Sequence, residues 1–92
     1  MAHSLDLKWS RRAHADLARI LDYIAQDKPG AAQALAVDMR AKAEHLRLHL
    51  YLGRESLPGV RELVLHRHYF LTYRIKPGRI EIVQVWHVAQ HR

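Results

Sequence analysis

The sequence contains no cysteine and no long apolar run. Without cysteine the chain cannot form a disulfide, offer a thiolate to a metal or use a cysteine nucleophile. Its longest apolar runs are far shorter than the ~18 residues that a membrane-spanning helix requires. Its first residues also lack a basic segment followed by an apolar one, as a signal peptide would have. We therefore expect a cytoplasmic protein without a transmembrane segment.

Several motifs of catalytic chemistry are also missing. The chain has only four glycines, and they do not form a phosphate-binding loop. No serine lies in the strand–turn–helix context of a nucleophile elbow. We predict no cofactor.

Two histidine pairs have the spacing of metal ligands. His45 and His49 lie four residues apart on a predicted helix, and His66 and His68 lie two apart at a strand end. Neither pair is accompanied by a third convergent ligand, which a stable site for zinc or a related metal requires. We expect both pairs to face solvent and predict no metal site.

The 92 residues suffice for one domain, and we assign 1–92 to it. Hydrophobic residues make up 49% and charged residues 26%, as in folded globular proteins. The net charge is +6, and residues 58–92 carry six basic side chains against two acidic ones. Such a field favours a nucleic acid or an acidic protein as partner. The alternative is a basic surface without a specific partner.

The first half of the chain predicts a strand and two helices. Leu5–Trp9 alternates apolar and polar residues, as a half-buried strand does. Ser10 is suited to cap a helix over Arg11–Gln26, whose apolar residues fall at helical spacing. Pro29 suits the first turn of an alanine-rich second helix that we place over Pro29–Leu50. The short connection between the helices predicts an antiparallel hairpin.

The second half predicts a loop that includes Ser56–Gly59, followed by a meander of three strands. Here apolar residues recur at every second position, as in strands. We place the three strands at Val60–Leu65, Tyr69–Ile75 and Ile80–Val88. The order β-α-α-β-β-β predicts an α+β fold. In this fold a two-helix antiparallel hairpin packs on one face of an antiparallel sheet.

The predicted strands are apolar on both faces. Phe70 opposes its apolar strand neighbours, and Val64 opposes Leu63 and Leu65. In the last strand the alternation places Ile80, Ile82, Trp86 and Val88 on one face, and Val83 and Val85 on the other. Because two helices cover only one face, we expect an apolar patch with a basic rim on the other, which is typical of a partner site. The loop, the chain ends or a second copy are alternative covers.

Several short sequence segments, which follow one another over nearly the whole chain, together form a recognisable pattern. They are Trp9-Ser10, Asp16-Leu17 through Tyr23-Ile24, Pro58-Gly59-Val60-Arg61-Glu62-Leu63, His68-Tyr69, Tyr73-Arg74-Ile75 and Val85-Trp86-His87. With the length, basicity and element order, this pattern resembles the RelE/ParE superfamily of toxins from type II toxin–antitoxin modules, often called plasmid stabilisation systems.

The resemblance implies a growth-arresting toxin that a cognate antitoxin neutralises in a hetero-oligomer. The antitoxin's acidic or amphipathic C-terminal segment typically wraps the toxin. ParE-like members poison DNA gyrase, whereas RelE-like members cleave messenger RNA in the ribosome. A basic binding module without toxicity is a further reading.

The ribonuclease branch holds phosphate with basic side chains and uses a general acid or base. Arg61 matches a basic position of that branch, and His87 is the candidate acid–base residue, although a structural role is the favoured interpretation for it. Where that branch has an arginine after an aromatic residue, this chain has Phe70. The tyrosine expected near the C-terminus is missing, and Arg92 ends the chain. These departures favour a ParE-like, non-nucleolytic toxin.

Five residues on the predicted sheet are candidates for binding the antitoxin or the target: Arg61, Arg67, Phe70, Arg74 and Trp86. Arginine binds carboxylate or phosphate in a bidentate manner, so Arg61 is suited to an anion clamp. A cross-strand ion pair with Glu62 or Glu81 is the alternative for Arg61, and for Arg74 a surface ion pair is the favoured interpretation.

Overall fold

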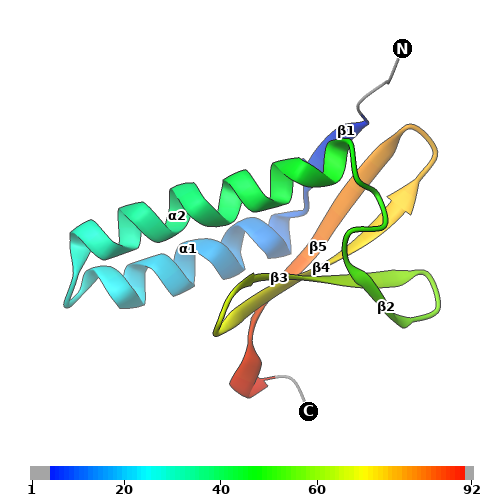
Figure 1. Ribbon diagram of the computed structural model, residues 1–92. Coiled ribbons are helices and arrows are strands. Elements are labelled where there is room, and N and C mark those ends of the chain that lie inside the picture. The colour runs from blue at the N-terminus through cyan, green and yellow to red at the C-terminus, as the bar shows by residue number, and fades with distance from the viewer. Residues whose placement is uncertain (1–4, 91–92) are drawn as a thin grey trace.

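A computed structural model describes residues 5–90 and shows two helices packed on one face of a five-stranded sheet (Figure 1). The predictions made for the first four residues and for Arg92 lie outside the described residues. The elements are β1 (Asp6–Trp9), α1 (Arg11–Ala25), α2 (Pro29–Glu44), the 3₁₀ turn η1 (His45–Arg47), β2 (Arg54–Leu57), β3 (Val60–His66), β4 (Tyr69–Lys76), β5 (Arg79–His87) and the 3₁₀ turn η2 (Val88–Gln90).

The sheet has the strand order β1-β5-β4-β3-β2. The predicted architecture is confirmed, with two differences. Residues expected in a loop form β2, because Gly59 adopts a φ of +78° and turns the chain back into β3. β1 runs parallel to β5, so the sheet is mixed rather than wholly antiparallel. Alternation of apolar residues identifies a strand but carries no information about its direction or neighbour.

Local signals explain where the helices begin. The Ser10 side chain accepts a hydrogen bond from the Ala13 N–H and thereby caps α1. α2 begins at Pro29 as expected but ends at Glu44, six residues before the predicted end. The chain there changes to η1, and Arg47 exchanges backbone and side-chain hydrogen bonds with Leu5. These contacts with the segment before β1 compete with continuation of the helix.

A β-bulge in β5 reverses the predicted facing of its second half. Thr72 pairs with Gln84, but Tyr73 pairs with Ile82, so Val83 has no opposite residue. The extra residue shifts the alternation by one. Val85 therefore lies in the helix-covered core with Ile80 and Ile82, whereas the sequence alternation had placed it on the other face.

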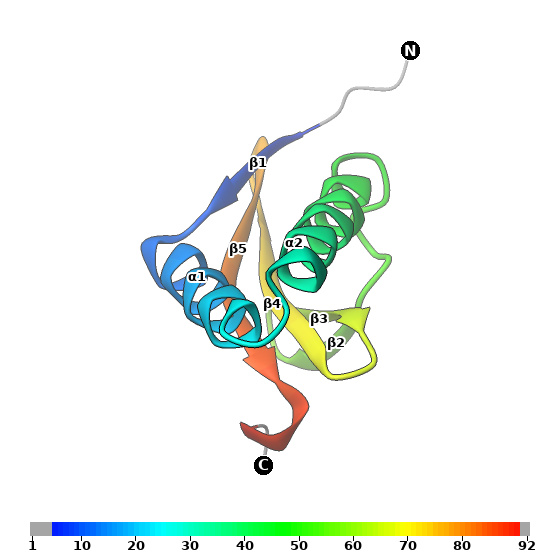
Figure 2. The ribbon, with the colours of Figure 1, turned by 90° about the vertical axis from the view of Figure 1, so that its left-hand side faces the viewer.

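The first helix covers the edge of β5 beyond the end of β1 (Figure 2). The Ser10 hydroxyl donates to the Val83 carbonyl over 2.7 Å, and the Val85 N–H donates to Asp16 Oδ2 over 3.1 Å. Asp16 is 2% exposed and also accepts from Arg12 and Arg19. Side chains of α1 and of its N-cap, Ser10, thus replace a neighbouring strand along this part of the sheet.

The connection between α2 and β2 is held against the sheet at Gly53. Its N–H donates to the hydroxyl of the fully buried Tyr73, which in turn donates to the Leu50 carbonyl. A Cβ at Gly53 would lie 2.3 Å from the Glu62 carbonyl oxygen. Only a residue without a side chain permits this close approach.

Within the described residues, no helix is both long and apolar enough to cross a bilayer.

We predict that Gly53→Ala lowers the free energy of unfolding by about 1–3 kcal/mol or more, because the added methyl group meets rigid backbone. The matched control is Gly30→Ala in α2, where an added Cβ has no neighbour within 4 Å. This control should be neutral or stabilising by up to ~1 kcal/mol. Urea unfolding of both variants measures the effect, and equal stabilities would contradict the tight contact at Gly53.

Candidate functional site

The sheet face away from the helices carries one polar row and one apolar row. Strand register places Arg54, Glu62, Thr72 and Gln84 side by side, and next to them Val64, Phe70 and Trp86. The Phe70 and Trp86 rings stack with centroids 6.2 Å apart, and Phe70 is only 5% exposed. We expected this face to be broadly apolar. It instead carries a row of polar side chains, and the apolar Phe70 on it is buried rather than exposed. The exposed apolar side chains on this face include Val64 of β3 and Leu57 of β2, which are 70% and 64% exposed.

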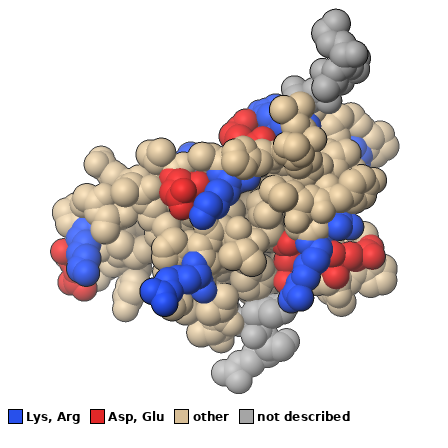
Figure 3. Space-filling view, viewed as in Figure 1, with Lys and Arg blue, Asp and Glu red and all other residues tan. Residues whose placement is uncertain are grey.

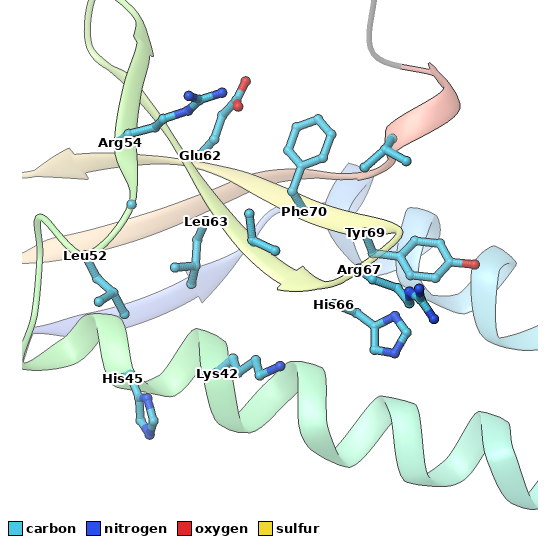
Figure 4. A pocket seen from close by; sticks show the side chains of 13 residues that line it. Lys42, His45, Leu52, Arg54, Glu62, Leu63, His66, Arg67, Tyr69 and Phe70 are labelled. Atoms are coloured by element: carbon cyan, nitrogen blue, oxygen red, sulfur yellow. The ribbon is translucent and has the colours of Figure 1, made fainter.

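A groove lies at the edge of β3 that faces α2 (Figure 4). β2 pairs with β3 only through Val60–Glu62, so among the described strands none covers the next part of this edge, Leu63–His66. Lys42 of α2 donates from Nζ to the Leu65 carbonyl over 2.7 Å and occupies part of the edge. The groove has a volume of about 590 Å³.

The groove combines apolar rims with positive charge. Leu52, Val64 and Val88 line it and are 53%, 70% and 46% exposed. Three further lining residues, Lys42, Arg54 and Arg67, are cationic, whereas Glu62 is its one acidic lining residue in the described chain. Such a surface is suited to a polypeptide that offers apolar side chains together with carboxylates.

Arg61 holds the protein's own backbone. Its Nε and Nη2 donate to the Gly53 carbonyl over 2.9 and 2.7 Å, and its guanidinium lies 5.1 Å from the Tyr51 ring centroid. The guanidinium therefore fixes the connection that precedes β2. Both interpretations of Arg61 offered by the sequence missed this role, because Gly53 and Arg61 meet only through the β2–β3 hairpin.

His87 has a fixed orientation at the end of β5. Its Nδ1 accepts a hydrogen bond from the Ala89 N–H over 3.0 Å. Its ring stacks on that of His68 at 5.8 Å with an interplanar angle of 2°, and the Tyr69 ring approaches edge-on at 5.1 Å. Both the structural and the acid–base interpretation remain compatible with this arrangement.

The two catalytic candidates are not brought together. Arg61 pairs with Tyr73 and His87 pairs with Tyr69, positions that lie four residues apart on β4. At about 3.3 Å per residue this separation is roughly 13 Å along the strand. A single reacting group is too small to contact both side chains.

The remaining candidates lie in different surroundings. Arg67 is exposed and lines the groove, whereas Arg74 is exposed on β4 opposite Glu81. Lys42 and Leu52 are groove residues that the sequence reasoning missed. Helical spacing places Lys42 beside the apolar stripe of α2, but the open strand edge that gives it a role is a tertiary feature.

His45, His49 and His68 are exposed, as expected, whereas His66 is half-buried and lines the groove. In the part of the chain that the structure describes, no three histidine or acidic side chains are grouped as metal ligands.

Residues 7–92 match the sequence model of the "ParE toxin of type II toxin-antitoxin system, parDE". The chain belongs to this toxin family. The toxin is also 38% identical over 82 residues to Toxin RelE2 of Caulobacter vibrioides, covering 89% of this chain and 93% of the relative. It is 30% identical over 84 residues to Toxin RelE3 of the same organism, covering 88% and 91%.

Solved structures show the same fold. The toxin resembles a chain of the chromosomal ParDE toxin–antitoxin system from P. aeruginosa with a TM-score of 0.81 and 30% identity, over 94% of this chain and 98% of that one. It resembles a chain of the RelBE2 complex from Mycobacterium tuberculosis with a TM-score of 0.54 and 23% identity, over 95% and 94%. The second likeness concerns the fold alone.

We predict that Arg61→Gln lowers the free energy of unfolding by about 1.5–3 kcal/mol, because a charged donor to a partly buried carbonyl is lost. Arg74→Gln removes the same charge from an exposed position and should stay within ~0.5 kcal/mol of the parent. Thermal or urea unfolding distinguishes them. If Arg61→Gln were as stable as the parent, the structural role assigned to Arg61 would be wrong.

Proposed function

We propose that this toxin arrests growth in the cytoplasm by binding DNA gyrase without catalysis of its own. We further propose that a cognate antitoxin neutralises it in a hetero-oligomer by occupying the groove beside β3. The separation of Arg61 from His87 is the observation that carries the choice of a non-nucleolytic toxin.

Transition-state stabilisation in RNA cleavage needs preorganised cations and an acid–base group around one phosphate. Here the guanidinium of Arg61 is engaged with Gly53 and Tyr51. Phe70, at the position of a family cation, is buried and stacked on Trp86. The groups that would form a cleavage site are thus engaged elsewhere, replaced or distant, which supports a binding mechanism.

The distribution of charge also supports a protein target. On the face shown in Figure 3, basic side chains are separated by broad uncharged surface, and several lie beside acidic ones. A protein that follows a nucleic-acid backbone usually presents a continuous basic stripe. An interrupted pattern is more typical of recognition between two folded proteins.

The groove supports the antitoxin part of the proposal. The ParDE and RelBE2 structures that share this fold are those of toxin–antitoxin systems. In this chain the apolar rims at Leu52, Val64 and Val88, together with the cations of the groove, match an amphipathic acidic segment. Such a segment would bury the exposed leucine and valine side chains and pair carboxylates with the arginines.

A ribosome-dependent endoribonuclease is the second candidate function. Two observations favour it: the curated relatives carry the name RelE, and His87 is held in a defined orientation by Ala89 and His68. In this mechanism His87 would be the general acid or base and Arg61 the phosphate ligand.

The first experiment separates these targets. The purified toxin is added to gyrase with relaxed plasmid, and separately to a translating extract with labelled mRNA. We expect loss of supercoiling and accumulation of cleaved DNA complexes at micromolar toxin, with intact mRNA. His87→Ala should retain gyrase inhibition within about threefold, since no proton transfer is involved. Cleaved transcripts that disappear with His87→Ala, and active gyrase, would replace the proposal by the ribonuclease function.

The second experiment tests the groove with the antitoxin encoded in the neighbouring reading frame. Val64→Glu should weaken antitoxin binding at least 30-fold, because truncating or charging a buried interface anchor costs about 2 kcal/mol or more. Gyrase inhibition by the same variant reports that the toxin is folded. Val37→Glu, at a site 71% exposed and outside the groove, is the control and should change affinity little. Equal affinities of the two variants would place the antitoxin elsewhere.

A further inference from the structure

The connection between α2 and β2 concentrates exposed apolar side chains at one end of the molecule, opposite the turn between the helices (Figure 1). Eight large apolar side chains are exposed in the described chain, and three of them, Leu48, Tyr51 and Leu52, lie within five consecutive residues here. Leu52 lines the β3 groove, whereas Leu48 and Tyr51, which are 61% and 71% exposed, do not. We call Leu48 and Tyr51 together the η1–β2 surface.

The backbone under this surface is attached to the sheet on both sides of Tyr51. The fully buried Tyr73 donates from its hydroxyl to the Leu50 carbonyl over 2.7 Å, and the same hydroxyl accepts from the Gly53 N–H over 3.0 Å. Ordering a loop on association costs free energy that weakens binding. Because this loop is already ordered in the free toxin, its exposed side chains are presented to a partner without that cost.

The ring of Tyr51 is oriented by Arg61. The Arg61 guanidinium lies 5.1 Å from the ring centroid, and its Nε and Nη2 both donate to the Gly53 carbonyl. A guanidinium held in this way keeps a cation next to the ring and thereby favours one ring position. Leu48 precedes Tyr51 by three residues, so their Cα atoms are at most about 11 Å apart. A preordered tyrosine next to an arginine is typical of the residues that carry binding energy in protein interfaces.

The charges beside the η1–β2 surface are complementary to an acidic partner. Arg54, at the start of β2, is exposed and, with Arg61, places positive charge near Tyr51. The two carboxylates nearest in sequence already have donors. Glu44 accepts from Arg47 Nε over 2.6 Å, and Glu55 accepts from a backbone N–H of the β2–β3 turn over 3.4 Å. Carboxylates on a partner would therefore be attracted to this end of the toxin.

From these observations we infer that the η1–β2 surface binds the toxin's target, a folded protein that offers an apolar hollow bordered by carboxylates. An ordered, projecting ring suits a folded partner, because neither side has to order a segment on association. Exposed apolar side chains grouped in this way are typical of a protein interaction site. That the target is DNA gyrase rests on the function proposed above, whereas the position of the target surface does not.

The position of this surface also provides a mechanism of neutralisation. Leu52, at the rim of the β3 groove, directly follows Tyr51 in the chain. A polypeptide seated in the groove would therefore lie next to the η1–β2 surface and exclude a large target by steric overlap. The antitoxin and the target would compete for the toxin although they contact different residues.

The test uses the full-length toxin with Tyr51→Ser or Leu48→Ser, and with Val37→Ser as the control. Val37 is 71% exposed on α2, as Tyr51 is on the connection, so the control removes an equally exposed apolar side chain elsewhere. Both test variants should need at least tenfold more toxin for half-inhibition of gyrase supercoiling, and at the expression level at which the parent arrests growth they should not arrest it. Their affinity for the antitoxin should stay within threefold of the parent, and Val37→Ser should match the parent throughout.

Urea unfolding shows that each variant is folded. If Tyr51→Ser does not fold, Leu48→Ser decides the test, because Leu48 lies outside the buried core.

Parental gyrase inhibition and growth arrest by the folded test variants would overturn the inference. A tenfold loss of antitoxin affinity would also overturn it, because the surface would then belong to the antitoxin site. So would binding to phosphatidylglycerol vesicles that Tyr51→Ser abolishes while growth arrest persists, because the surface would then contact a membrane. If the parent arrests growth without inhibiting gyrase, the proposed function fails, and growth arrest by the variants still decides where the target binds.

Discussion

The architecture depends on the contact between the buried carboxylate of Asp16 and the Val85 N–H. β1 pairs with β5 only as far as Ile82, so the remainder of β5 would expose backbone groups along its edge. Ser10 and Asp16 supply hydrogen bonds there and fix α1 at a defined height against the strand. An unpaired buried donor typically costs ~1–3 kcal/mol, so this contact constrains the helix strongly. The bulge at Val83 then turns Val85 toward the helices, and with it the end of the strand that carries His87.

A second set of hydrogen bonds, at Gly53, determines why part of the β3 edge has no neighbouring strand. Tyr73 and Arg61 both attach Gly53 to the sheet, which leads the chain from α2 into the short β2. Because β2 pairs with only the first residues of β3, the rest of that edge faces α2 across the groove. Lys42 occupies this edge in the manner by which proteins discourage unwanted strand pairing. The residue that looked most like a phosphate ligand thus contributes by shaping a binding surface.

The groove beside β3 combines two features of a surface for a polypeptide partner. Leu52, Val64 and Val88 offer apolar area, and Lys42, Arg54 and Arg67 offer positive charge. A partner of the kind proposed above would bury apolar surface there, while its carboxylates would fix its register along the groove. Such a division commonly separates affinity from specificity in protein recognition.

The sequence by itself determined the element types, the helical hairpin on one face of the sheet and the absence of cysteine chemistry, because periodicity and capping residues act locally. It also carried the family pattern through segments such as Val85-Trp86-His87. Tertiary structure alone decided the bulge at Val83, the parallel pairing of β1 and the engagement of Arg61 by Gly53. It also decided that Phe70 is buried against Trp86. These features depend on which backbone groups remain unpaired once the strands are assembled. The alternation of apolar and polar residues along one strand does not specify which strands lie beside it.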